Sequence, residues 1–270
     1  MTFVRALLGA HLLCAASATV GFWCAACARK GQRVHRASGF WFARFVYLTA
    51  LTGATLAVIR LVALYRLSQA DAASVAVERQ TMWLVLYVLL IIVTPVQHGL
   101  AVVAAGPTPH AIRSRTHATL NILSMIGSIV LLPAALLSQQ FLFLIVVPIG
   151  LIVGLRNLNY AIKPVSTRDE WRREHLTSQL TAGITLHTAL LVFGTSRTLG
   201  LQLTGMASLW PWMIPALVGV PVIVWMRGGR SEGPEGPKGP ESPKGPEGSR
   251  GREGRLGPQE PAGSVRRRGV

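Results

Sequence analysis

The sequence predicts an all-α membrane protein, a polytopic bundle of seven transmembrane helices followed by a polar tail. Half of the 270 residues are apolar and only 14% are charged, whereas about a quarter of the residues in a soluble domain are charged. Seven apolar runs approach the roughly 20 residues with which a helix crosses a bilayer. A backbone in lipid must satisfy its own hydrogen bonds, so each run is expected to be a helix.

The seven spans are expected at residues 3–28, 40–59, 82–103, 118–137, 141–155, 176–193 and 209–226. The fifth run is short for a membrane helix. Pro95 and Pro148 lie inside two of the spans and are expected to kink or locally open their helices. Thr167 and Glu170 have the spacing of a capping box, which predicts that a helix begins there, before the sixth span.

Basic residues predict how the bundle is oriented, because they gather in alternate connections. The first, third and fifth connections and the end of the last span hold Arg29, Lys30, Arg33 and Arg36, then Arg113 and Arg115, then Arg156, Lys163, Arg168, Arg172 and Arg173, and finally Arg227 and Arg230. Basic loops stay in the cytoplasm. We therefore expect an N-terminus outside, a cytoplasmic C-terminus, and anionic lipid headgroups as partners of the basic loops.

The net charge of +16 does not by itself predict nucleic-acid binding, since the charges lie between apolar runs and in the tail. From Gly233 onward, glycine recurs at nearly every third position, as in a collagen-like repeat. Ser242 interrupts that repeat, and proline, glycine and mixed charges dominate the segment. Such a composition predicts a disordered, low-complexity tail over residues 230–270, whose protein partner the sequence does not identify.

Chemical motifs of soluble enzymes are not found, so the sequence favours a protein without enzymatic activity. It contains no P-loop, no GxSxG and no HExxH motif. All three cysteines, Cys14, Cys24 and Cys27, lie in the first span and are expected to be packing residues, so no metal site is predicted. The acidic residues outside the tail are Asp71, Glu78, Asp169, Glu170 and Glu174, and none falls deep inside an expected span. This argues against a proton-coupled transporter driven by a carboxylate.

The histidines suggest an alternative function, a haem-b protein that transfers electrons across the membrane. His11 and His187 lie about 12 Å and about 9 Å from the outer ends of their spans, so they could share one level. Two imidazoles from facing helices are axial ligands of such a haem. His98, His117 and His175 form a second group at the inner side. The competing interpretation is that each histidine bonds a neighbouring helix, and the sequence leaves both open.

Polar residues inside the spans suggest a further alternative, a small-molecule transporter or sensor. The sixth span carries polar residues on two faces, and the fourth carries a line of small polar residues, Asn121, Ser124 and Ser128. Such helices belong inside a bundle, so spans one, three, four and six are expected to line its interior. A membrane scaffold, whose basic first connection and tail recruit a cytoplasmic partner, is another alternative.

A candidate site at the cytoplasmic face consists of His35, Arg36, Trp171 and His175. His35 and Arg36 follow the first span, in a segment where lysine or arginine alone would set the topology. Trp171 and His175 are four residues apart, so they share one face of the helix that begins near Thr167.

Several motifs resemble those of an uncharacterised family of bacterial multi-pass "predicted membrane proteins". They are His11, Lys30-Gly31 and His35-Arg36-x-x-Gly39 in the first half, then Trp171-x-x-x-His175, Thr188-Ala189 and Trp212-x-x-Pro215 with Gly219-x-Pro221. The resemblance covers the membrane region without the tail and implies a multi-pass protein of the bacterial plasma (inner) membrane. It implies no activity. The leading interpretation is an integral membrane protein with a polar, histidine-bearing interior.

Overall fold

The computed structural model describes residues 2–66, 72–107, 112, 114–137, 141–163, 167–195, 207 and 209–228. The chain divides into two units, Met1–Arg230 and Ser231–Val270. The predicted disordered tail therefore lies outside the described residues, and the fold is that of the first unit.

Every regular element in the described ranges is a helix, as the sequence predicts. The elements are α1 (Thr2–Cys27), α2 (Arg33–Arg66), α3 (Ala72–Ala105), α4 (Arg115–Leu137), α5 (Phe141–Ile162), α6 (Arg168–Ala189), the π-helical η1 (Leu190–Thr195) and α8 (Trp210–Gly228). Six of them are long and apolar enough to cross a membrane, and the helix Trp210–Met226 is apolar but shorter. The fold is thus an all-α bundle of the kind found in multi-pass membrane proteins.

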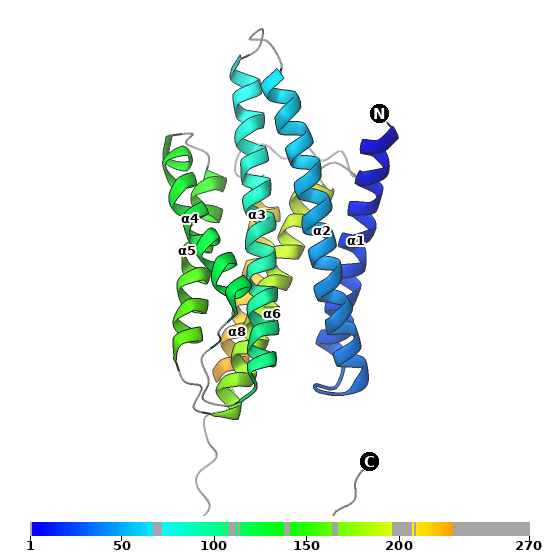
Figure 1. Ribbon diagram of the computed structural model, residues 1–270, viewed down its shortest axis with the longest axis vertical. Helices are drawn as coiled ribbons and strands as arrows, with labels where there is room; N and C mark the ends of the chain where they lie inside the picture. The colour runs from blue at the N-terminus through cyan, green and yellow to red at the C-terminus, as the bar shows by residue number, and fades with distance from the viewer. Residues whose placement is uncertain are drawn as a thin grey trace, which may run out of the picture. The chain divides into compact units, whose positions relative to one another are not determined.

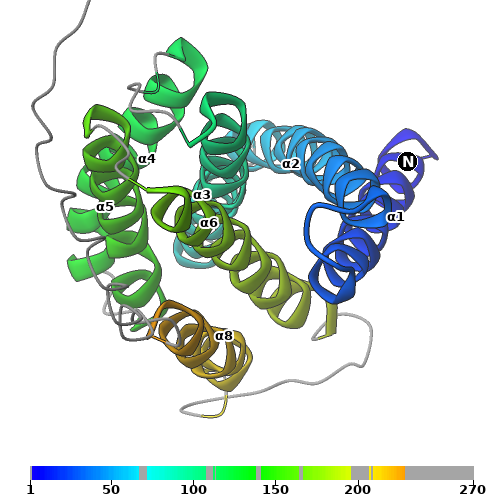
Figure 2. The ribbon, with the colours of Figure 1, turned by 90° about the horizontal axis from the view of Figure 1, so that it is seen from below.

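The helices alternate in direction, and α3 lies at the centre of the bundle (Figure 1). α3 packs against α2, α4, α5 and α6, while α1 packs mainly against α2. Seen from below, α3 and α6 lie between the α1–α2 pair and the α4–α5 pair (Figure 2). Only 6% of the apolar stretch of α1 is buried, against 61% for α3. The expectation that the first span lines the interior is therefore wrong for most of its length.

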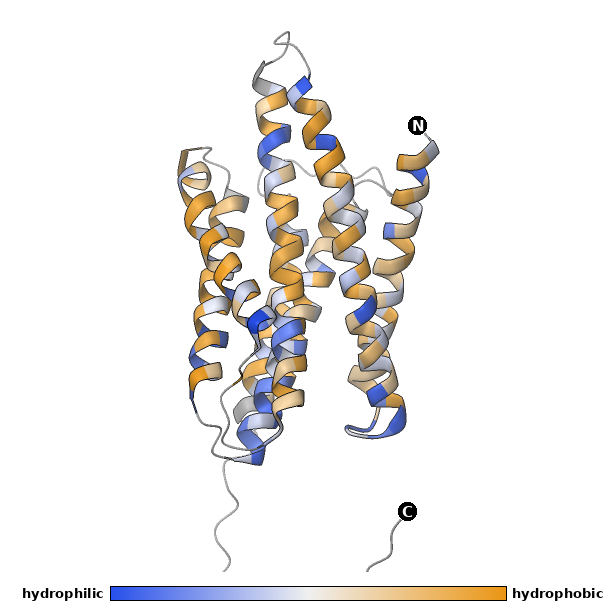
Figure 3. Ribbon diagram, viewed as in Figure 1, coloured by the Kyte–Doolittle hydropathy of each residue, from blue (hydrophilic) through white to orange (hydrophobic). Residues whose placement is uncertain are grey.

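The outer surface of the bundle is apolar along most of the helices (Figure 3). Leu137 and Trp225 are 85% and 75% exposed, and many other exposed side chains are leucine, isoleucine or valine. Contiguous apolar surface of this extent suits lipid rather than water. Hydrophilic residues gather instead at the lower end of α6 and in the connection between α1 and α2 (Figure 3).

Three helices extend beyond the spans expected from the sequence, and one of these differences changes the position of a charged residue. α2 and α3 extend well beyond the expected spans, and α5 continues to Ile162 instead of ending near residue 155. Arg156 consequently lies within α5 and not in a connecting loop. α6 begins as the capping box predicts, because the Thr167 hydroxyl accepts a hydrogen bond of 3.1 Å from the Glu170 N–H.

Two glycines of α5 allow the backbones of α4 and α5 to approach closely. A Cβ atom at Gly150 would lie 2.8 Å from the backbone oxygen of Ser124, and one at Gly154 would lie 2.9 Å from that of Asn121. The two glycines are four residues apart, so they lie on the same face of the helix. Small residues at this spacing are a common basis of helix packing in membranes.

The Tyr87 side chain of α3 forms hydrogen bonds at this contact between α4 and α5. Its hydroxyl accepts a hydrogen bond from the Gly150 N–H (3.0 Å) and donates one to the Val147 carbonyl (2.7 Å). It also lies 2.7 Å from the Ser128 hydroxyl of α4. One buried side chain thus joins three helices, and its own hydroxyl is fully hydrogen-bonded there.

Substitution of Gly150 by alanine should weaken the α4–α5 contact. The added Cβ would meet the Ser124 backbone and the Tyr87 hydroxyl, so we expect a loss of about 1–3 kcal/mol in the free energy of unfolding. Gly9→Ala is the matched control, because nothing lies within 4 Å of a Cβ at that position of α1. Unfolding of both variants in detergent would be measured, and equal stabilities would contradict the assigned packing.

Candidate functional site

A chain of three ionisable side chains lies inside the bundle near the lower ends of α3, α4 and α6. His98 is fully buried, and His117 and Glu174 are 1% and 5% exposed. The His98 Nδ1 atom lies 2.7 Å from His117 Nε2, and His98 Nε2 lies 3.1 Å from Glu174 Oε1. We call these three residues the His–His–Glu chain. It links three helices that are distant in the sequence.

The direction of each hydrogen bond in the His–His–Glu chain follows from the chemistry of its members. An ionised carboxylate only accepts hydrogen bonds, so His98 Nε2 carries a proton and donates it towards Glu174. In neutral His98, Nδ1 is then the acceptor, and His117 Nε2 donates. If His98 gains a proton, Nδ1 becomes a donor, and His117 must present Nε2 as the acceptor. One added proton therefore reverses the second hydrogen bond.

Arg156 of α5 supplies a cation to the same carboxylate. Its Nη2 atom lies 3.1 Å from Glu174 Oε1 and 3.2 Å from the Asn157 side-chain oxygen. The Arg156 side chain is 30% exposed, whereas Glu174 is almost fully buried. Burying a carboxylate is costly unless it is paired and hydrogen-bonded. The imidazole and the guanidinium together meet that requirement.

A column of buried polar residues continues from His117 along α4. Asn121, Ser124 and Ser128 follow His117 at helical spacing, and all four are buried. The Asn121 side chain donates to the His117 carbonyl (2.7 Å) and accepts from the Asn157 amide (2.9 Å). From His117 to Ser128 the column covers about 16 Å along the helix, roughly half of a hydrocarbon core about 30 Å thick.

Tyr160 of α5 completes the surroundings of His98. Its ring stands edge-on to the His98 imidazole, with 5.5 Å between the ring centroids. The buried Tyr160 hydroxyl has no hydrogen-bond partner among the residues that the structure describes. This hydroxyl is therefore a polar group available to a water molecule or a ligand next to the His–His–Glu chain.

The structure brings together part of the predicted inner group of histidines. His98 and His117 are in direct contact, whereas the His175 ring donates through Nδ1 to the Gly99 carbonyl (3.1 Å). Trp171 donates to the Val102 carbonyl (2.7 Å). Trp171 and His175 thus hold α6 against the last turns of α3, which is a structural role.

The other half of the predicted cytoplasmic-face site belongs to the α1–α2 hairpin. The His35 ring donates to the Ala25 carbonyl (2.9 Å), and Arg36 is exposed. Lys30 donates to the carbonyls of Ala25 and Ala26, and its burial there lowers the pKa of the Lys30 ammonium. These contacts cap the end of α1.

His11 and His187 are held apart, so the expectation that they share one level is wrong. The His11 Nδ1 atom lies 3.1 Å from the Thr49 carbonyl, on α2. His187 Nε2 instead accepts a hydrogen bond of 3.0 Å from the Trp23 indole. Trp23 follows His11 by twelve residues in α1, which corresponds to about 18 Å along the helix axis.

The residues do not fit a haem held by His11 and His187. Axial ligation needs a ring nitrogen of each histidine directed at one iron. Both nitrogens of His187 are engaged, Nδ1 with the Gly183 carbonyl (2.7 Å) and Nε2 with Trp23. His98 and His117 are bonded directly to each other, which leaves no place for iron between those two nitrogens. Within the described ranges, no group of three or more histidine, cysteine or acidic residues could hold a metal ion.

Sequence reasoning missed Glu174 and Arg156, which it placed outside the spans. Glu174 lies in α6, about 9 Å from the first residue of that helix. Glu174 is not deep in its span, as expected, but it is buried inside the bundle, which was not predicted from the sequence. The sequence did contain an indication that Glu174 faces the interior. In the helix that starts after Thr167, Glu174 lies four residues before Ser178, on the polar face that was expected to face inward.

Comparisons of the chain with protein-family models, with curated proteins and with solved structures find no match. The resemblance to a bacterial membrane-protein family therefore remains a prediction.

Removal of the Glu174 carboxylate should destabilise the bundle far more than removal of an exposed one. We expect Glu174→Ala to cost about 3 kcal/mol, because Arg156 and His98 lose their shared partner. The control is Glu78→Ala, which breaks the exposed pair of Arg60 and Glu78 (2.7 Å) and should cost less than about 1 kcal/mol. Reversible unfolding in mixed micelles measures both, and similar costs would contradict the assignment.

Proposed function

We propose that the protein is a proton-coupled transporter of the bacterial plasma membrane, in which the His–His–Glu chain binds the proton. The observation that carries this proposal is the direct contact of His98 with both His117 and Glu174 inside an apolar bundle. Ionisable side chains buried inside a membrane bundle are costly, and in membrane proteins they usually bind ions or conduct protons.

Histidine is suited to this role because it gains and loses a proton near neutral pH. The charged and titratable groups around His98 come from each neighbouring helix: His117 from α4, Glu174 and His175 from α6, and Arg156 and Tyr160 from α5. A proton on His98 changes its attraction to Glu174 and reverses its hydrogen bond with His117. The contacts of α3 with α4 and with α6 thus change together.

α3 has a feature that would allow such a change to move a helix. Pro95 lies inside α3, three residues before His98. Proline removes one backbone hydrogen bond and weakens the helix locally. The Gln97 side chain beside it accepts a hydrogen bond of 2.5 Å from the Tyr47 hydroxyl of α2. The lower part of α3 therefore has separate ties to α2, α4 and α6, and protonation alters two of them.

Transport is the activity that the polar column supports best. A proton sensor would need polar groups only around the His–His–Glu chain. The buried polar residues of α4 continue from His117 as far as Ser128, well beyond that chain. Side chains that can exchange hydrogen bonds provide a route for a proton through the apolar bundle.

We further propose seven spans, with α8 as the seventh, an N-terminus outside and α8 ending in the cytoplasm. The connection between α1 and α2 lies at the same end of the bundle as the C-terminal end of α5 and the N-terminal end of α6 (Figure 1). All three places carry basic residues in the sequence, which agrees with the positive-inside rule. The apolar part of α8, Trp210–Met226, has 17 residues, about the minimum for a spanning helix.

Fusions of a fluorescent protein that folds only in the cytoplasm would test this topology. We expect fluorescence from fusions after Lys163 and after Gly228, and none from a fusion after Arg66. The reason is that two more helices, α6 and α8, return the chain to the side of Lys163. A dark fusion after Gly228 with a bright one after Lys163 would show that α8 does not cross the membrane.

Proton binding would be tested by titrating the purified protein in vesicles between about pH 5 and 8, with tryptophan fluorescence as the readout. We expect a reversible change in the wild type, since Trp171 bridges α6 and α3, and its loss in His98→Gln and Glu174→Gln. Glu78→Gln is the control and should titrate as the wild type does. An unchanged titration of both site variants would contradict the proposal.

Transport itself would be tested with a pH-sensitive dye inside the vesicles and a panel of amino acids, sugars and organic ions outside. We expect at least one solute to drive proton movement in the wild type and none to do so in Glu174→Gln. A pH titration without any solute-driven proton movement would instead indicate a pH sensor.

A further inference from the structure

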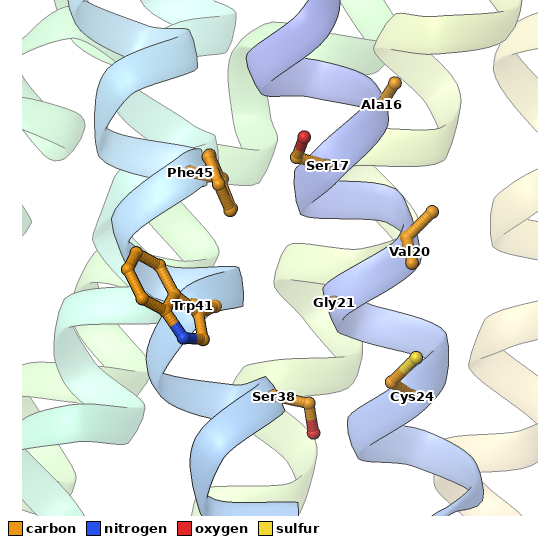
Figure 4. Close-up of a pocket in the computed structure, with 8 residues that line it drawn as sticks. All are labelled: Ala16, Ser17, Val20, Gly21, Cys24, Ser38, Trp41 and Phe45. Carbon is orange, nitrogen blue, oxygen red and sulfur yellow. The ribbon is translucent and has the colours of Figure 1, made fainter.

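A groove opens on the outside of the α1–α2 hairpin, away from the His–His–Glu chain. α1 lines it with Ala16, Ser17, Val20, Gly21 and Cys24, and α2 with Ser38, Trp41 and Phe45 (Figure 4). The α1 side consists of small residues, and the α2 side is mainly aromatic. Val20, Cys24 and Trp41 are exposed, so the groove faces the lipid.

Two arginines border the aromatic side of this groove. Arg33 and Arg44 are eleven residues apart in α2, so they lie within about 20° of each other around the helix. The Arg44 guanidinium lies over the Phe40 ring, 4.0 Å from its centroid, and Phe40 contacts Trp41 edge-on. Helical side chains lean towards the helix N-terminus, so both arginines are displaced in the same direction and their charges remain about 16 Å apart along the axis.

The hairpin supplies no anion for these arginines. No aspartate or glutamate occurs before Asp71 in the sequence. Arg33 and Arg44 are exposed, and neither has an ion-pair partner among the described residues. Lys30, by contrast, is occupied by the carbonyls at the end of α1. The hairpin thus presents an apolar groove with uncompensated positive charge at one side.

From this combination we infer a binding site for one anionic phospholipid, with an acyl chain in the groove and the headgroup phosphate on Arg44, in the positive potential that Arg44 and Arg33 create along this side of α2. The small residues of α1 leave room for a chain, and Trp41 and Phe45 provide a flat apolar wall. An arginine can bind a phosphate through two parallel hydrogen bonds. A lipid fits better than a protein helix, because an apolar partner helix would leave both arginines without an anion.

The experiment uses the full chain in vesicles that contain a small fraction of lipid with brominated acyl chains, which quench nearby tryptophans. The Trp41 signal is the difference between the wild type and Trp41→Phe. We expect brominated phosphatidylglycerol to quench this signal more than brominated phosphatidylcholine at the same mole fraction. Each basic residue near an anionic surface contributes about fivefold to lipid affinity, so Arg33→Gln and Arg44→Gln should each reduce the preference by about that factor.

Arg60→Gln is the matched control, since Arg60 lies near the other end of α2 and is paired with Glu78. It should keep the wild-type preference. Equal quenching by the two lipids in the wild type, or a full preference in the Arg33→Gln/Arg44→Gln double variant, would overturn the inference. A variant with Cys24 as its sole cysteine tests whether a second copy of the chain covers the groove. Rapid disulfide formation between two such chains, with little quenching by either lipid, would show that it does and would also overturn the inference.

Discussion

The hydrogen-bonded carboxylate of Glu174 is the constraint on which the lower half of the bundle depends. A carboxylate with 5% exposure in an apolar bundle is stable only if cations and donors surround it. His98 and Arg156 meet this need from α3 and α5. Because each comes from a different helix, pairing with Glu174 fixes how α3, α5 and α6 lie against one another. The Trp171 and His175 contacts with α3 carbonyls then set the register of α6 within that arrangement.

Much of the fold follows from rules that act along a single helix. Apolar length, the alternation of basic loops and the cap at Thr167 predict the helices and where α6 begins, and all three depend on neighbouring residues. The polar line of Asn121, Ser124 and Ser128 was likewise readable as an inward face. The hydrogen-bond partner of each polar residue could not be predicted from the sequence. Glu174 and Arg156 lie near span ends, where a charged residue can equally well reach the headgroups. Only the arrangement of the helices around α3, which packs against both α5 and α6, decides between burial and exposure.

His11 and His187 show the opposite error. Their similar distances from the span ends suggested a common level, an estimate that treats all helices as parallel rods of equal tilt and offset. In the structure His187 lies beside Trp23, near the end of α1, while His11 lies beside Thr49. Offsets of this kind come from close helix contacts, such as that of Gly183 with the Phe22 ring. Contacts between helices are set by shape, which a depth estimate for each helix does not contain.

Arg156 bears on the proton exchange proposed for His98, because it keeps Glu174 paired when His98 is neutral. If His98 were the sole partner of Glu174, removing the imidazole charge would leave a buried carboxylate without a cation, at a cost of several kcal/mol. Arg156 stays charged at all relevant pH values, and at 3.1 Å it remains a partner of Glu174 in either state of His98. The two protonation states still differ by a full charge on the buried His98 ring as well as by the direction of the His98–His117 hydrogen bond. Glu174 attracts that charge and Arg156 repels it, so the two effects partly offset each other. A small free-energy difference between two ordered states is what reversible coupling of proton binding to helix movement requires.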